Sequence, residues 1–103
     1  GIEPISVEEI HAQLLLEVNQ RLEGSAGADI ASVFDEKMAQ FVSTLVRRFL
    51  SNKKKEVSLQ VIYEYLSHAV KNSAQYKALE HTENAKQKRK SIAAAFSAFV
   101  SKY

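Results

Sequence analysis

The sequence contains no Cys and no Trp, and it has one Pro and three Gly among its 103 residues. The absence of Cys excludes disulfide bonds, thiolate metal ligands and cysteine nucleophiles. So little Gly and Pro disfavours a turn-rich β architecture, and no glycine-rich phosphate loop is present. The longest strongly apolar run, Leu14 to Leu16, is far too short to cross a bilayer. With no secretory signal pattern either, we expect an intracellular, cytoplasmic protein without a membrane partner.

The length and composition fit one globular domain spanning residues 1–103. Hydrophobic residues make up 46% of the chain and charged residues 25%, which is close to the average for folded domains. A chain of this size buries enough surface to fold without disulfides or metals. Because the sequence begins with Gly1 rather than Met, we expect a processed chain or a piece of a longer protein.

Charge is distributed unevenly along the chain. Residues 1–50 contain four basic and eight acidic side chains, a balance of −4, whereas residues 51–103 contain ten basic and four acidic side chains, a balance of +6. The pattern predicts opposite faces of opposite sign, or a basic surface for an acidic partner. The alternative is that the two halves attract each other in the folded protein.

The first predicted helix covers residues 6–23. Ser6 and Glu9 form a capping box, in which the Ser6 hydroxyl accepts from the Glu9 amide, and Ile5 lies where a hydrophobic staple begins. Apolar side chains then recur every three or four residues, as on one face of a helix. They are Val7, Ile10, Leu14, Val18 and Leu22.

The second predicted helix covers residues 29–51, with Asp29 as its N-cap. It has the most continuous apolar face of the chain and is therefore expected at the centre of the core. That face consists of Ile30, Phe34, Met38, Phe41, Leu45 and Phe49.

Two more helices are predicted in the second half of the chain, over residues 58–72 and 83–101. Ser58 begins the third, and Asn72–Ser73 breaks it unless it continues to residue 80. Thr82 or Asn84 is the expected cap of the fourth. The apolar stripe of the third is Leu59, Ile62, Leu66 and Val70, and that of the fourth is Ile92, Phe96, Phe99 and Tyr103. Since no strand pattern is present, we predict an all-α, four-helix antiparallel bundle.

No catalytic or metal-binding constellation is apparent. The chain has no nucleophile elbow, and its Glu8–His11 pair has the Glu-x-x-His spacing of di-metal bundles only once, where such sites need it twice. We therefore expect no enzyme activity, no metal, no cofactor and no small-molecule substrate.

Two features favour a binding role. The first is a set of basic residues that together would form a surface for nucleic-acid phosphates. Its members are Arg47, Arg48, Lys53, Lys54, Lys55, Lys86, Lys88, Arg89 and Lys90. The ordinary alternative is a solvated helix face.

The second feature is a run of small side chains on the last helix, which would let another helix approach closely. The candidate interface consists of Ser91, Ala94, Ala95, Ala98 and Ser101, together with Tyr65, which falls off the apolar stripe of its own helix. The alternative for the small residues is high helix propensity with tight internal packing. Taken together, the sequence predicts a non-catalytic protein-interaction or regulatory module, with partner binding or self-association, and a nucleic-acid-binding module as the alternative.

Overall fold

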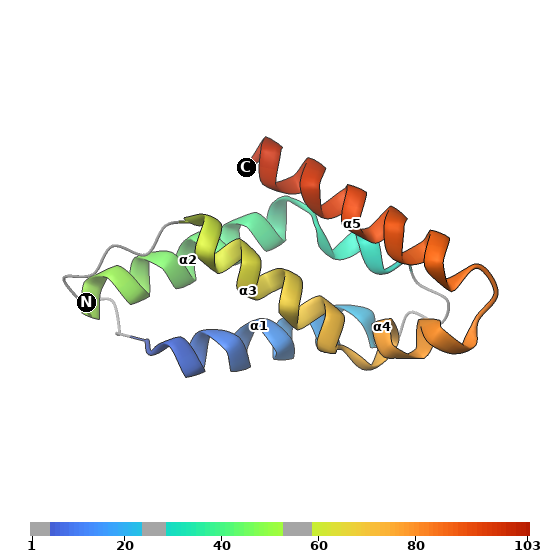
Figure 1. Cartoon of the computed structure of the whole chain (residues 1–103). Helices are drawn as coiled ribbons and strands as arrows, with labels where there is room; N and C mark the ends of the chain where they lie inside the picture. Colours follow the sequence, from blue (N-terminus) through green and yellow to red (C-terminus); the bar gives the residue numbers. More distant parts are fainter. Residues whose placement is uncertain (1–4, 24–28, 53–58) are drawn as a thin grey trace.

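The computed structural model of the chain describes residues 5–23, 29–52 and 59–103. Its elements follow in the order α1 (Val7–Leu22), η1 (Ile30–Val33), α2 (Glu36–Asn52), α3 (Leu59–Asn72), α4 (Ala74–Ala78), η2 (Leu79–His81) and α5 (Ala85–Lys102), where η marks a 3-10 helix. Every regular element in these ranges is helical, which confirms the all-α prediction (Figure 1). The four-helix antiparallel bundle is not confirmed, because the described ranges hold five α-helices and two 3-10 helices in an elongated body of 46 × 25 × 19 Å. None of these helices combines the length and the apolar character needed to cross a membrane.

The centre of the molecule is α3, and not the predicted 29–51 helix. α3 packs against α1, α2, α4 and α5, and its closest association is with α1. Figure 1 shows α3 crossing between α1 on one side and α5 on the other. The residues that α3 buries are Ile62, Tyr63, Leu66, Ala69 and Val70. Two of these, Tyr63 and Ala69, lie beside the predicted stripe, because a helix surrounded by neighbours buries more than one face.

The start of α1 follows its sequence pattern. The Glu9 amide donates to the Ser6 hydroxyl at 3.1 Å, so the predicted cap is confirmed. Ile10, Leu14, Val18 and Leu22 are buried, as their spacing predicts, whereas Val7 is only partly buried.

The predicted helix over residues 29–51 is interrupted. Asp29 accepts a hydrogen bond from the Ala31 amide at 3.0 Å, but it begins only the 3-10 helix η1. Asp35 then accepts from the Met38 amide at 2.8 Å and begins α2. The chain therefore has two capping aspartates in succession, and the second one separates Ile30 and Phe34 from the rest of the predicted stripe.

A break after Asn72 separates α3 from α4. The Ser73 hydroxyl is fully buried, donates to the Val70 carbonyl at 2.7 Å and accepts from the Tyr76 amide at 3.2 Å. Ser73 thus closes one helix and caps the next, so residues 74–80 form a separate short segment. The predicted start of this helix at Ser58 lies outside the described residues.

The start of α5 differs from its prediction. Asn84 occupies the N-cap position in the left-handed conformation, with φ 60°, and makes no side-chain capping bond. Asn tolerates this region better than most residues. The Thr82 hydroxyl donates to the Leu79 carbonyl at 2.7 Å instead. Neither of the expected residues therefore caps α5 through its side chain.

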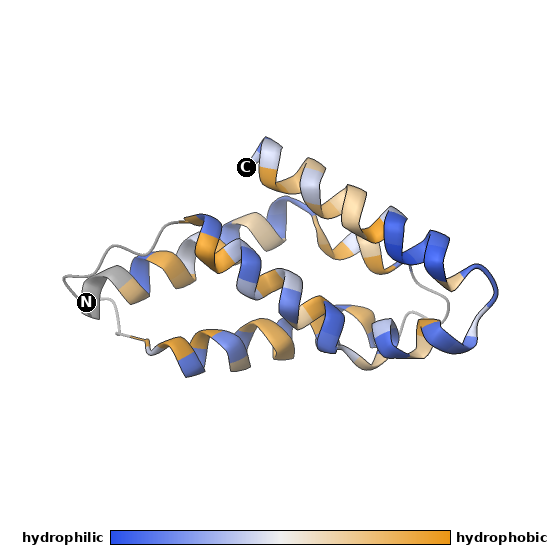
Figure 2. Ribbon diagram, viewed as in Figure 1, coloured by the Kyte–Doolittle hydropathy of each residue, from blue (hydrophilic) through white to orange (hydrophobic). Residues whose placement is uncertain are grey.

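Aromatic side chains attach α5 to the rest of the molecule. Its buried residues are Ile92 and Phe99, and the Phe99 ring lies 5.6 Å from Phe34, 5.2 Å from Tyr63 and 5.3 Å from Tyr103. Figure 2 shows that the first turns of α5 are hydrophilic and that its later turns are more hydrophobic. The helix packs against η1, η2 and α3. Ile92 and Phe99 of the predicted stripe are buried, whereas Phe96 is partly buried and Tyr103 at its end is 38% exposed.

Candidate functional site

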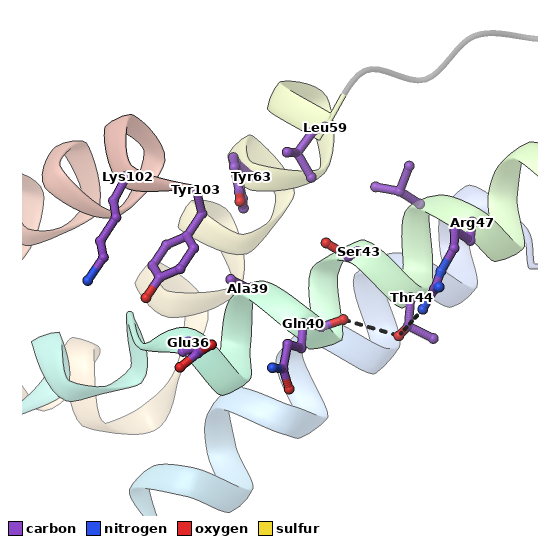
Figure 3. Close-up of a pocket in the computed structure, with 11 residues that line it drawn as sticks. Glu36, Ala39, Gln40, Ser43, Thr44, Arg47, Leu59, Tyr63, Lys102 and Tyr103 are labelled. Carbon is purple, nitrogen blue, oxygen red and sulfur yellow. Dashed lines mark hydrogen bonds between the residues drawn. The ribbon is translucent and has the colours of Figure 1, made fainter.

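A groove runs along α2, with the first turns of α3 on its other side and the C-terminal end of the chain at one end (Figure 3). Its volume is about 900 Å³, and the α2 residues along it extend from Glu36 to Arg47. Eleven helical steps of about 1.5 Å make this wall roughly 16 Å long, or about three turns. The groove is therefore long enough for a short helix to lie along it.

The floor of the groove is apolar, and its rim is polar. Ala39 and Tyr63 are buried beneath it, and Val46, Leu59 and Tyr103 complete the apolar lining. Along the rim, the Thr44 hydroxyl donates to the Gln40 carbonyl at 3.1 Å and accepts from Arg47 Nη2 at 3.3 Å, as Figure 3 shows. The remaining rim residues are Glu36, Ser43 and Lys102.

The groove remains open because α5 is packed on other elements. α5 contacts η1, η2 and α3, while α2 packs on α3. The interruption at Asp35 contributes to this arrangement, since Phe34 of the preceding segment meets Phe96 and Phe99 of α5 with ring centroids 5.5 and 5.6 Å apart. α2 and the first turns of α3 thus form the long sides of the groove, and Lys102 and Tyr103 close one end of it.

Tyr63 lies at the junction between the core and the groove. Its burial raises the pKa of the phenol above the ordinary value of 10.0, and the nearby Tyr103 phenol raises that pKa further. Because ionisation of Tyr63 would place an unpaired anion among the rings, the neutral phenol is the form that the fold favours. Lys102 Nζ lies 5.3 Å from the Tyr103 ring centroid, so a cation also borders this end of the groove.

The structure divides the predicted protein interface. Ser91, Ala94, Ala98 and Ser101 are exposed along the outer face of α5, and Ala95 is half-buried. Tyr65 is not part of this face. Its half-buried side chain contacts α1, with its ring 4.2 Å from the His11 ring, centroid to centroid.

The predicted basic surface is also divided. Lys86, Lys88 and Lys90 are exposed and Arg89 is half-buried in the first turns of α5, whereas Arg47 and the half-buried Arg48 lie near the far end of α2. Lys53, Lys54 and Lys55 lie outside the described residues. Figure 1 shows the start of α5 and the end of α2 at opposite ends of the molecule.

The groove gives the scale of this separation. Arg47 lines the same groove as Lys102. Lys102 is 12 to 16 residues further along α5 than the 86–90 segment, which is roughly 18–24 Å at about 1.5 Å per residue. The described basic residues at 47–48 and 86–90 therefore do not form the single basic patch that the sequence predicted.

Charge is nevertheless segregated by helix. α5 has five basic residues and no acidic one, and none of the five forms an ion pair with any residue that the structure describes. Arg21 pairs within the first half of the chain, with Asp35 at 2.9 Å and Glu17 at 3.4 Å. The basic charge of α5 thus faces solvent instead of neutralising the acidic half of the chain.

The histidines form no metal site in the part of the chain that is described. No three His, Asp or Glu side chains converge there in a way that could hold an ion. The His11 ring contacts the Tyr65 ring at a tilt of 41°, and His68 and His81 are exposed on α3 and at the end of η2.

The chain matches no protein-family model, and comparison with curated proteins and with solved structures finds no similar one.

Proposed function

We propose that the protein is a non-catalytic interaction module that binds an amphipathic helix of a partner protein in the groove along α2. The observation that carries the proposal is the form of the groove, which is about 900 Å³ in volume, apolar at its floor and polar at its rim. An amphipathic helix buries its apolar face in such a groove and leaves its polar face in water. The wall along α2 is about three turns long, which accommodates anchors at positions i, i+3 or i+4, and i+7.

The rim favours a partner helix with acidic flanks. Two cations, Arg47 and Lys102, line the groove against one carboxylate, Glu36. A second copy of the chain is disfavoured as the occupant if it approaches through α5, because that helix carries five basic residues and no acidic one. Bringing two such helices together would place like charges opposite each other.

The experiment uses a display library of helical 12-residue peptides selected on the whole chain. We expect the selected peptides to share apolar anchors at helical spacing with acidic flanks, and to shift amide resonances of residues 36–47. The variant Ser43→Trp, at an exposed rim position, should fill the groove and weaken binding at least about tenfold, the loss of one anchor side chain. Ala12→Trp, which also enlarges a small exposed side chain but on α1 and away from the groove, is the matched control and should bind as the parent does.

The result would contradict the proposal if no peptide were selected, or if Ser43→Trp bound as well as Ala12→Trp. Binding that mapped to the outer face of α5, and that Ser101→Trp abolished, would move the interface to the small side chains.

Nucleic acid is a second candidate partner, favoured by one specific observation. Four basic residues, Lys86, Lys88, Arg89 and Lys90, occur within the first turns of α5 and form no ion pair among the described residues. If all four neutralise phosphates, the logarithm of the duplex DNA binding constant should fall with log salt at a slope of about −3 to −4. Fluorescence anisotropy with a labelled duplex measures this slope.

A triple Lys86→Gln, Lys88→Gln, Lys90→Gln variant should make this salt dependence less steep, whereas Arg47→Gln, at the other end of the molecule, should leave it unchanged. No binding at low salt would remove this candidate.

A further inference from the structure

A second cavity lies among α3, α4, α5 and the residue that ends η1. Its volume is about 270 Å³, and it shares no lining residue with the groove described above. Phe34, which lines this cavity, and Tyr63, which lines the groove, both contact the Phe99 ring, at 5.6 and 5.2 Å between centroids. The two spaces are therefore separate, and Phe99 lies between them.

The inner wall of the cavity is apolar. Val70 and Ile92 are 1% and 8% exposed, and the Phe34 and Phe96 rings meet edge to face at 5.5 Å beside them. Water bound against such a wall would lack hydrogen-bond partners, so an apolar group is favoured there.

The rim of the cavity is basic and rich in hydroxyl groups. Lys71 of α3 and Arg89 of α5 both line it, and the described lining includes no acidic residue. Neither cation forms an ion pair with a described residue, although Arg89 is half-buried. Partial burial makes an opposite charge more favourable beside Arg89 than at a fully hydrated site. Donors and acceptors are supplied by the hydroxyls of Ser67, Tyr76 and Ser97.

We propose that this cavity binds a small amphiphilic carboxylate, with its apolar body against Phe34, Phe96 and Ile92 and its carboxylate at Arg89 and Lys71. The planar guanidinium of Arg89 matches a carboxylate through two parallel hydrogen bonds. A volume of about 270 Å³ equals the space of roughly nine water molecules, which limits the body to about ten non-hydrogen atoms. A medium-chain fatty acid or an arylalkanoic acid meets both conditions.

The experiment titrates the whole chain with octanoate, followed by amide chemical shifts and by calorimetry. We expect saturable binding, with the largest shifts at Phe34, Ile92 and Phe96. 3-Phenylpropionate should bind comparably, while 1-octanol and acetate, each lacking one half of the amphiphile, should bind at least about tenfold more weakly. Arg89→Gln should weaken octanoate binding about tenfold or more, and Lys71→Gln should do so less strongly because Lys71 is more exposed.

Two controls separate this site from other effects. Lys86→Gln removes an exposed charge of the same helix that does not line the cavity, and Ser43→Trp obstructs the groove, so both should bind octanoate as the parent does. The proposal is overturned by no saturable binding, by octanol binding as tightly as octanoate, by an unchanged affinity in a folded Arg89→Gln variant, or by shifts that map to residues 36–47.

Discussion

Replacement of Phe99 by Ala is the change expected to have the largest effect on α5. Phe99 is 3% exposed and contacts the rings of Phe34, Tyr63 and Tyr103. Truncating a buried Phe to Ala costs about 3–5 kcal/mol. Each lost aromatic contact adds about 0.5–1.5 kcal/mol to the effect of burial alone, which favours the upper part of that range. A domain of this size has a free energy of unfolding of about 5–15 kcal/mol, so the variant loses a large share of it.

The loss should be concentrated in α5, because Ile92 is the other buried residue of that helix. Urea unfolding followed by circular dichroism measures the total loss, and native-state hydrogen exchange measures it residue by residue. We expect amides of α5 to exchange faster than those of α1 and α3. Phe99→Leu, which keeps most of the volume but removes the ring, should cost only about 1–2 kcal/mol.

Two results would refute this account of α5. If Phe99→Ala lowered the free energy of unfolding by less than about 1 kcal/mol, the packing of the Phe99 ring would contribute little to stability. Equal acceleration of exchange in α1 and α5 would show that α5 does not open separately from the rest of the fold.

Three further predictions concern ionisation and capping. Because the pKa of Tyr63 is raised in the fold, the neutral phenol contributes stability that is fully present below the ordinary value of 10.0 and is lost as the pH rises through the higher folded value. Between about pH 8 and 11, urea midpoints should therefore fall more steeply for the parent than for Tyr63→Phe. Parallel curves for the two proteins would contradict this. Asp35→Ala removes the cap on the Met38 amide and the ion pair with Arg21, and should cost about 1–2 kcal/mol, whereas Asp35→Asn keeps a capping oxygen and should cost about half of that or less; equal losses in urea unfolding would assign the effect to the ion pair. Ser73→Ala leaves the Tyr76 amide without its capping hydroxyl and should cost about 1–2 kcal/mol in the same assay, with a value below about 0.5 kcal/mol excluding a structural role for those bonds.

The sequence predicts local features of the fold where a short pattern of neighbouring residues is compatible with only one structure. The Ser6 cap and the buried face of α1 follow from hydrogen-bonding capacity and helical spacing within a few residues. The break at Ser73 was one of two alternatives that the sequence left open. The interruption at Asp35 was not predicted, although the residue itself is a capping type. The apolar spacing from Ile30 to Phe49 is compatible with one helix throughout, and so it concealed a second cap between Phe34 and Met38.

The position of the binding surfaces could not be predicted in the same way. Which helix lies at the centre depends on how the helices pack, and α3 occupies that place although α2 has the longer apolar pattern. The smaller cavity, and the end of the groove at Lys102 and Tyr103, depend on the placement of α5 on Phe34 through Phe96 and Phe99, contacts between residues more than sixty positions apart. Arg89 was predicted as part of a basic cluster, but its place beside an apolar cavity depends on that same long-range contact.

The docking of α5 has a thermodynamic consequence for recognition. α5 supplies Lys102 to one end of the groove and one wall to the cavity. Besides its two buried side chains, Phe96 and Val100 hold it by packing against the core. Any molecule that binds only when α5 is docked raises the free energy of undocking, by an amount that grows with its concentration relative to its Kd. If α5 undocks in the free protein, a ligand in the cavity would also favour the docked form that completes the groove, and by reciprocity the reverse would hold.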